Sequence, residues 1–215
     1  MSGQAIEFVL ATANPDKARE IAEVLTEALG SDIADGAVVL LPRDPDLPEV
    51  EETGATLEEN ARLKAIAISS GTGRPAIADD TGLEVDAIGG APGVHTARFA
   101  GEGASYGDNV DLLLERLAPL EGAARSARFV TVAIARWPDG HEVAALGTVE
   151  GTIARSPRGS GGFGYDPVFV PAEGDGRTFA EMTAAEKHHL SHRGRAFRSL
   201  ADGVRAVIAA DTTPE

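Results

Sequence analysis

The first 30 residues join a strand pattern to a helix pattern, and this order constrains the fold more than any other feature. An apolar run from Ile6 to Ala11 predicts a strand, and a helix is expected from about Pro15 to Leu29. Asn14 suits the N-cap, Pro15 suits the first helical position, and Gly30 follows the last apolar residue. A strand that passes through a short polar turn into a helix is typical of an α/β protein.

Helix and strand patterns alternate along the rest of the chain. The further helices are expected over 57–70, over 106–120 and from about Ala184, the last one interrupted near Ser191 to Gly194. A short strand is expected over 37–41, and two β-rich runs flank a Pro-Asp-Gly turn at 138–140, which predicts a hairpin. These patterns predict an α/β fold with a mixed central sheet and flanking helices.

The composition excludes several classes of protein. Lys and Arg total 19 against 34 Asp and Glu, so a net charge of −15 repels nucleic-acid backbones. No run approaches the roughly 20 apolar residues of a membrane span, and the start lacks the features of a signal peptide. The chain has no cysteine, which excludes disulfides, thiolate metal sites and a cysteine nucleophile. We expect one globular domain over residues 1–215, located in the cytoplasm, without nucleic-acid or membrane partners.

Two adjacent carboxylates, Asp79 and Asp80, follow the apolar start of "AIADDTGLEV" (76–85), where the strand is expected to end. Side chains alternate faces along a strand, so the two should point in opposite directions. One carboxylate would then face a site while the other braces the turn. Ligands bind at the carboxyl ends of strands in open α/β sheets, and Mg²⁺ takes carboxylate oxygens. An Asp-Thr-Gly turn in which both acids cap backbone amides explains the pair equally well.

Two further segments carry groups suited to a phosphate or a metal. In "TANPDK" (12–17), N–H groups at a helix start favour phosphate, although an ordinary capped helix with a solvated Lys17 explains the pattern as well. In "EVEETG", Glu49, Glu51 and Glu52 are candidate metal ligands, although such an acidic loop is more often simply solvated.

Two segments near the C-terminus suit a flat or an anionic ligand. The glycines of "GGFGYDPVF" let the backbone approach a ring that stacks on Phe163 or Tyr165, and a flexible loop with two core aromatics is the alternative. The segment "EKHHLSHRGRAF" gathers Lys, His and Arg in an otherwise acidic chain. Its three histidines lack the partners of a zinc motif, so a histidine metal site is disfavoured. A solvated helix face explains several of the basic residues.

Taken in order, five motifs resemble one family. They are "TANPDK", "EETGATLEENARLKA", "ADDTGLEVDAIGGAPGVHTARFAG", "GGFGYDPVF" and "EKHHLSHRGRAF". Together they are similar to the non-standard purine NTP pyrophosphatases, the dITP/XTP or inosine triphosphate pyrophosphatase family, from about Phe8 to Phe197. The resemblance implies Mg²⁺-dependent hydrolysis of ITP, dITP and XTP to the monophosphate and pyrophosphate. It also implies a homodimer of elongated α/β subunits whose two lobes flank a substrate cleft.

The resemblance also assigns roles by position. Asp80 would be the general base, Lys17 would be catalytic, Glu51 and Asp80 would serve the metal, and Asp79 is inferred to support the turn. The implied substrate-binding residues are Thr12, Ala13, Asn14, Pro15, Asp16, Lys17, Thr81, Phe163, Gly164, Tyr165, Asp166, Lys187, His192 and Arg193. Ala13 departs from the Gly or Asn usual in the family, but a small residue still permits close approach.

The implied chemistry is physically consistent with these residues. Cleavage between the α and β phosphates needs a water near the α-phosphorus, a carboxylate that takes its proton, and cations for the leaving pyrophosphate. Asp80 either takes this proton directly or positions a metal-bound water. A 6-oxo purine presents an acceptor where adenine presents a donor, so donors from His192, Arg193 or the backbone near 163–166 would discriminate against adenine. Rejection of GTP must act at the 2-amino group, and no residue in the sequence explains it.

Two other functions compete with this interpretation. A Maf-type pyrophosphatase has a related architecture and acts on pyrimidine or modified nucleotides, but the "SHRGRAF" and "GGFGYDP" segments favour the purine family. A catalytically silent nucleotide sensor on the same fold is the second alternative. The joint presence of Asp80, Lys17 and Lys187 argues against a silent protein.

Overall fold

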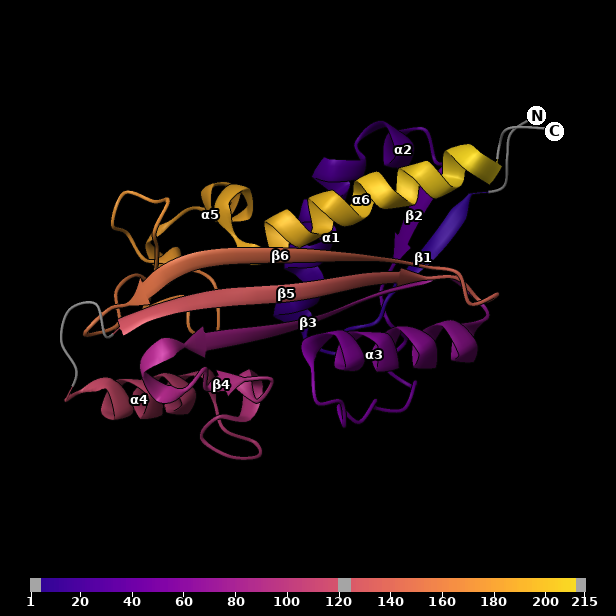
Figure 1. Cartoon of the computed structure of the whole chain (residues 1–215). Coiled ribbons are helices and arrows are strands. Elements are labelled where there is room, and N and C mark those ends of the chain that lie inside the picture. Colours follow the sequence, from indigo (N-terminus) through magenta and orange to yellow (C-terminus); the bar gives the residue numbers. More distant parts are fainter. Residues whose placement is uncertain (1–4, 120–124, 212–215) are drawn as a thin grey trace. The chain divides into compact units, whose positions relative to one another are not determined.

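A computed structural model describes residues 5–119 and 125–211 and shows a mixed α/β fold with helices on a central sheet (Figure 1). Among the described residues the sheet has seven strands in the order β2-β1-β3-β5-β6-β7, and β4 pairs with β3. β1 runs parallel to both β2 and β3, whereas β4 is antiparallel to β3 and β7 is antiparallel to β6. The strands are β1 (Ile6–Leu10), β2 (Val38–Leu41), β3 (Ala76–Val85), β4 (Pro92–Gly93), β5 (Ser126–Arg136), β6 (Glu142–Ile153) and β7 (Phe169–Pro171).

The helices confirm most of the sequence-based predictions. Only the four-residue α2 was not expected, and Leu120, the last residue of the predicted third helix, lies outside the described residues. The interruption near the C-terminus is confirmed and is confined to Ser191, which separates two helices. The helices are α1 (Pro15–Leu29), α2 (Ser31–Ala34), α3 (Leu57–Thr72), α4 (Tyr106–Leu117), α5 (Ala184–Leu190) and α6 (His192–Asp211). None of the described helices combines the length and apolarity that a membrane crossing needs.

Local hydrogen bonds explain where these elements begin and turn. The Asn14 side chain accepts from the N–H groups of Asp16 and Lys17, and Pro15 occupies the first turn of α1, as predicted. Reciprocal capping boxes start α3 and α5. The predicted hairpin turn is closed by the N–H of Trp137, which donates to the carbonyl of His141 over 2.9 Å.

The prediction that the strand ends at the adjacent carboxylates is wrong. β3 continues through them to Val85, and no turn lies at Asp79 for that residue to support. The extension pairs with another segment of chain, since Leu83 is in register with Gly93 of β4 and donates its N–H to the Thr96 hydroxyl over 2.8 Å. The first residues of the Gly-rich segment that follows the two aspartates therefore belong to a strand.

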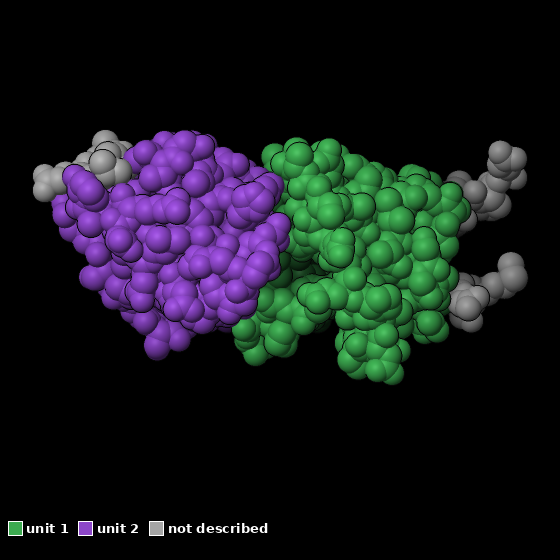
Figure 2. Space-filling view, turned by 90° about the horizontal axis from the view of Figure 1, so that it is seen from below, with its two compact units in different colours: residues 1–80, 132–146, 195–215 green, residues 81–131, 147–194 purple. Residues whose placement is uncertain are grey.

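The chain forms two compact units, drawn in green and purple in Figure 2. Unit 1 comprises residues 1–80, 132–146 and 195–215, and unit 2 comprises residues 81–131 and 147–194. The boundary in β3 falls between Asp80 and Thr81. Each unit has its own apolar core, and the core of unit 2 centres on Phe129, Phe169 and Phe179.

In unit 1, both faces of the sheet are covered by helices (Figure 1). One core cluster joins Phe8 and Ile77 to apolar residues of α1 and α6. The other joins Val9 and Ala78 to the face of α3 that carries Ala61, Ala65 and Ile68. Alternate residues of a strand therefore face different helices, and this alternation decides where the two carboxylates of β3 point.

Candidate functional site

The first turn of α1 places Lys17 beside Asp79. Asp79 has the same strand parity as Ile77, so it faces α1, and its Oδ2 lies 3.8 Å from Lys17 Nζ. The Asp79 side chain is fully buried, whereas that of Lys17 is 19% exposed. The Thr12 hydroxyl accepts from the N–H of Asn14 over 3.1 Å. The structure thus brings together Lys17 and Asp79, and the partner of Asp79 is a cation rather than a turn.

Asp80 points the opposite way, as strand alternation requires, and contacts α3. Lys64 Nζ lies 3.2 Å from Asp80 Oδ1 and 2.8 Å from Glu52 Oε1. The Asn60 side-chain amide donates to Asp80 Oδ2 over 3.3 Å. Asn60 and Lys64 are one helical turn apart, so one face of α3 holds both oxygens of the same buried carboxylate.

Burial and charge act in opposite directions on the ionisable pair in this cluster. Burial raises the pKa of Asp80, and the nearby charges of Lys64 and Lys17 oppose that rise without cancelling it. Burial alone would lower the pKa of Lys64, but the negative charges of Asp80, Asp79 and Glu52 outweigh it, and the pKa is raised. Lys64 is therefore firmly cationic, and Asp80 is a carboxylate with increased proton affinity.

Glu51, one of the two predicted metal ligands, is exposed in the loop before α3, and its assignment stays a prediction. The adjacent Glu52 is instead linked to Asp80 through Lys64. Among residues 5–119 and 125–211, no group of three or more His, Asp or Glu side chains is placed to hold a metal ion. Mg²⁺ is commonly held by one or two carboxylates plus substrate phosphates, and the carboxylate oxygens of Asp80 and Glu52 are donors of the type that this ion takes.

A second cluster lies in unit 2 and contains most of the other predicted binding residues. Lys187 Nζ lies 2.6 Å from Asp166 Oδ2, and both side chains are buried. The same oxygen accepts from the N–H of Phe163 over 2.8 Å. A Cβ on Gly162 would collide with this carboxylate, and Gly162 has a positive φ of 67°, so the residue must be glycine for the loop to close on Asp166.

Phe163 is the half-buried aromatic surface of this second cluster. Lys187 Nζ lies 4.9 Å from the centroid of its ring, and the Arg193 guanidinium carbon lies 5.1 Å from it. Tyr106, an exposed aromatic residue, places its ring centroid 5.8 Å from that of Phe163. Arg193 also donates to the Thr81 hydroxyl over 3.3 Å. Cations around an aromatic ring suit a flat ligand that carries acceptor groups.

Two other predicted residues are buried in unit 2. The His192 ring stacks on Phe129 with centroids 4.3 Å apart and is 1% exposed. Tyr165 is 3% exposed and donates its hydroxyl to the Thr96 carbonyl over 3.0 Å, and burial raises its pKa. Gly164 has a positive φ of 64°. The roles of these three residues in binding stay predictions.

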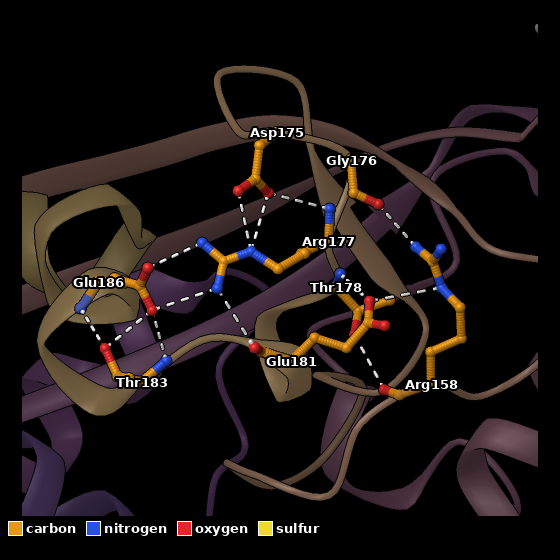
Figure 3. A network of polar contacts seen from close by, with 8 residues as sticks. All are labelled: Arg158, Asp175, Gly176, Arg177, Thr178, Glu181, Thr183 and Glu186. Atoms are coloured by element: carbon orange, nitrogen blue, oxygen red, sulfur yellow. Dashed lines mark hydrogen bonds and ion pairs between the residues drawn. The ribbon is translucent and has the colours of Figure 1, made fainter.

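A surface network fixes the start of α5, the helix that carries Lys187 (Figure 3). Arg177 is bonded to Asp175 over 2.9 Å and to Glu186 over 2.8 Å. Glu186 also accepts from the N–H and the hydroxyl of Thr183, the N-cap of the helix. These bonds, Arg177 first, lower the pKa of Glu186 to about 2. The network therefore fixes the start of the helix that carries Lys187.

Sequence reasoning missed two residues of the Asp80 cluster, Asn60 and Lys64. The signal was present, because both are strongly polar and lie at i and i+4 on the α3 face that also carries Ala61, Ala65 and Ile68. A lysine and an asparagine on an apolar helix face need buried partners. Only the packing of α3 against β3 shows which partner they find.

Comparison with known proteins places the chain in a family. The sequence model of the Ham1 family matches residues 8–203. The dITP/XTP pyrophosphatase of Thermus thermophilus is 48% identical over 94% of this chain and 93% of its own length. That of Streptomyces avermitilis is 46% identical over 94% and 98%.

Solved structures agree with the sequence comparison. A HAM1 protein from Coxiella burnetii superimposes with a TM-score of 0.81 at 37% identity, over 94% of this chain and 99% of its own. A nucleoside-triphosphatase/dITP/XTP pyrophosphatase from Mycobacterium abscessus gives a TM-score of 0.70 at 41% identity, over 91% and 97%. The likeness thus covers nearly the whole chain in both sequence and fold. The chain therefore belongs to the Ham1 family.

Proposed function

We propose that this chain is a nucleoside-triphosphate pyrophosphatase that hydrolyses dITP and XTP, and also ITP, to the monophosphate and pyrophosphate. Relatives that are 46–48% identical over nearly the full length are dITP/XTP pyrophosphatases. The observation that carries the proposal is the buried Asp80 carboxylate, held by Lys64 and Asn60 on one side of β3, with Lys17 and Asp79 on the other. A buried base beside cations suits hydrolysis of an anionic substrate.

Asp80 is the proposed general base. Water attacks the α-phosphorus, its proton passes to Asp80, and the bond from the α-phosphorus to the bridging oxygen breaks, so that pyrophosphate leaves with the bonding electrons. Burial raises the pKa of Asp80, which increases its proton affinity and suits a proton acceptor. Lys17, 19% exposed and at the start of α1, is the proposed partner of the polyphosphate charge.

Mg²⁺ is a further part of the proposal. Asp80 would hold it, Glu51 is the predicted second ligand, and phosphate oxygens would complete its coordination. When bound, such an ion would supply positive charge for the leaving pyrophosphate. The homodimer implied by the resemblance likewise stays a prediction.

The proposed partner of the purine base is the cluster of unit 2. The Phe163 ring offers a surface for stacking, and Arg193 supplies N–H donors beside it. A 6-oxo purine accepts such donors, whereas adenine would set its amino group against them and leave buried donors unpaired. Lys187 is held by Asp166, which keeps its ammonium near the same ring.

The decisive experiment supplies the purified protein and Mg²⁺ with dITP, XTP, ITP, GTP, ATP and dTTP in ¹⁸O-labelled water. We expect release of pyrophosphate from dITP, XTP and ITP, with the label in the monophosphate, because water attacks the α-phosphorus. Preferential cleavage of dTTP would favour a pyrimidine-directed enzyme, and nucleotide-induced thermal stabilisation without turnover would favour a sensor. Release of orthophosphate would also contradict the proposal.

Asp80→Asn tests the role of the carboxylate. The change removes the base and one negative charge at nearly constant volume, so we expect a folded protein that has lost most of its turnover. Asp32→Asn is the matched control, because Asp32 is paired with Arg205 over 2.7 Å elsewhere in unit 1. A near-normal rate for Asp80→Asn would show that the assigned role is wrong.

A further inference from the structure

We infer that Asn60 is a positioning residue for the proposed reaction, acting through Asp80. This inference rests on the proposed function. Asn60 is 1% exposed and lies on the face of α3 that packs against β3. Its side chain joins two parts of unit 1, since it donates to Asp80 Oδ2 over 3.3 Å and accepts from the N–H of Gly54 over 2.8 Å.

The contact with Gly54 fixes the orientation of the Asn60 amide. A backbone N–H can only donate, so the oxygen of the amide must face Gly54 and its NH₂ group must face Asp80. In the reverse orientation an NH₂ group would face an N–H, and a carbonyl oxygen would face a carboxylate. The amide therefore presents a donor to Asp80 in the arrangement that also satisfies the loop.

The loop comes unusually close to the helix at this contact. A Cβ on Gly54 would lie 2.6 Å from the Cβ of Glu59 and 2.7 Å from Asn60 Oδ1, so only glycine permits the approach. Gly54 follows the acidic segment that contains Glu51 and Glu52. Through one side chain, Asn60 thus ties that segment and the Asp80 carboxylate to the same turn of α3.

Lys64 and Asn60 divide the work of holding Asp80. Lys64 contacts Oδ1 of Asp80 with a positive charge. Asn60 donates an uncharged hydrogen bond to Oδ2 and so fixes the orientation of the carboxylate. A carboxylate held at both oxygens has a fixed plane, and a base must present a lone pair within hydrogen-bond reach of the attacking water. Without the Asn60 side chain, Asp80 would keep its negative charge, but its carboxylate plane would no longer be fixed.

A second asparagine provides a matched control. Asn109 occupies the same position of α4, four residues after the capping serine, as Asn60 occupies in α3 after Thr56. It is 2% exposed and accepts from the N–H of Ala100 over 2.8 Å, but it donates to the carbonyl of Ala97 over 3.1 Å instead of to a carboxylate. Both asparagines anchor a loop, and only Asn60 contacts the proposed base.

The test compares Asn60→Ala and Asn109→Ala at a temperature well below both unfolding transitions, with kcat corrected for the folded fraction. We expect Asn60→Ala to lower kcat by roughly 10- to 100-fold, the usual effect of removing a group that orients a functional ligand, with the KM for dITP nearly unchanged. We expect Asn109→Ala to lose a similar amount of thermal stability and to keep its kcat. Equal kcat values for the two variants would overturn the inference.

An exchange of side chains provides a readout that does not depend on turnover. In Asn60→Asp two carboxylates face each other, and we expect a lower Tm. Adding Asp80→Asn restores one amide and one carboxylate with their positions exchanged, and we expect the Tm to recover by roughly 2 to 4 °C, equivalent to about 1 kcal/mol. Additive losses would show that the contact is absent. If the wild type cleaves no triphosphate, the proposed function fails; if it is active and Asn60→Ala is too, only the positioning role fails.

Discussion

Substitution of Lys64 by methionine is the sharpest test of the buried cluster in unit 1. The change keeps the length of the side chain and its apolar stem, but it removes the ammonium group that lies 2.8 Å from Glu52 and 3.2 Å from Asp80. The Lys64 side chain is only 10% exposed and that of Asp80 only 6%. After the change, Asp80 keeps its hydrogen bond from Asn60 but loses the cation at its other oxygen.

The expected loss follows from the burial of the two partners. Removing one partner of a buried ion pair costs about 3 to 5 kcal/mol, because the other charge stays in a poorly solvated place. Glu52 is 28% exposed, and water can solvate it after the change, so we expect the lower end of that range. For a chain of this size, about 3 kcal/mol corresponds to a fall in Tm of roughly 6 to 12 °C.

The stability lost in Lys64→Met should depend on pH in a defined direction. The pKa of Asp80 is already above its ordinary value of 3.8 because of burial, and removal of Lys64 raises it further. A carboxyl whose pKa is higher in the folded chain than in the unfolded chain stabilises the fold at low pH, and this contribution is lost as the pH rises above 3.8 and through the folded pKa. The penalty of Lys64→Met should therefore be full at neutral pH and shrink in acid.

Urea unfolding of the metal-free protein measures this penalty. Trp137 is the only tryptophan and belongs to unit 1, so its fluorescence reports on the unit that contains Lys64. Lys64→Met with Asp80→Asn is the control, because removing both charges should restore part of the lost stability. A loss of stability below about 1 kcal/mol, the size expected of a surface pair, would contradict the buried ion pair. A loss that is the same at pH 7 and in acid would contradict the raised pKa of Asp80.

Two further predictions concern unit 2. Gly162→Ala should lower the free energy of unfolding by about 1 to 3 kcal/mol, because it combines a positive φ with a collision against Asp166; calorimetry checks this, and an unchanged Tm would contradict it. Glu186→Gln should have its full destabilising effect above the ordinary carboxyl pKa of 4.5. Bonds from Arg177 and Thr183 lower the pKa of Glu186 in the folded chain to about 2, so their contribution to stability is lost as the pH falls from 4.5 toward that value. Thermal melts of both proteins across the acid range measure it, and a difference that persists at the lowest pH would point to another cause.

Much of the fold could be predicted from the sequence because its signals are local. The Asn14 cap, the Pro15 start, the two Thr-x-x-Glu capping boxes and the Pro-Asp-Gly hairpin each depend on residues within about five positions of one another. A side chain that accepts from an N–H two or three residues away needs no tertiary contact. The order of the five motifs likewise indicates the family without any tertiary information.

The extent of β3 could not be predicted locally. Two adjacent aspartates and a glycine discourage a strand, yet the strand continues to Val85 because β4 and Thr96 satisfy its backbone. Tertiary pairing here outweighs local preference.

The sequence by itself determined that Asp79 and Asp80 point in opposite directions, because strand alternation is a property of the backbone. Only the tertiary structure decided what each one meets: Lys17 of α1 on one face, and Lys64 and Asn60 of α3 on the other. Those partners lie 16 to 62 residues away in the sequence. Rules that depend on neighbouring residues cannot identify partners at such a separation. Because a different helix packs on each face of the sheet, the two adjacent carboxylates lie in two different electrostatic environments.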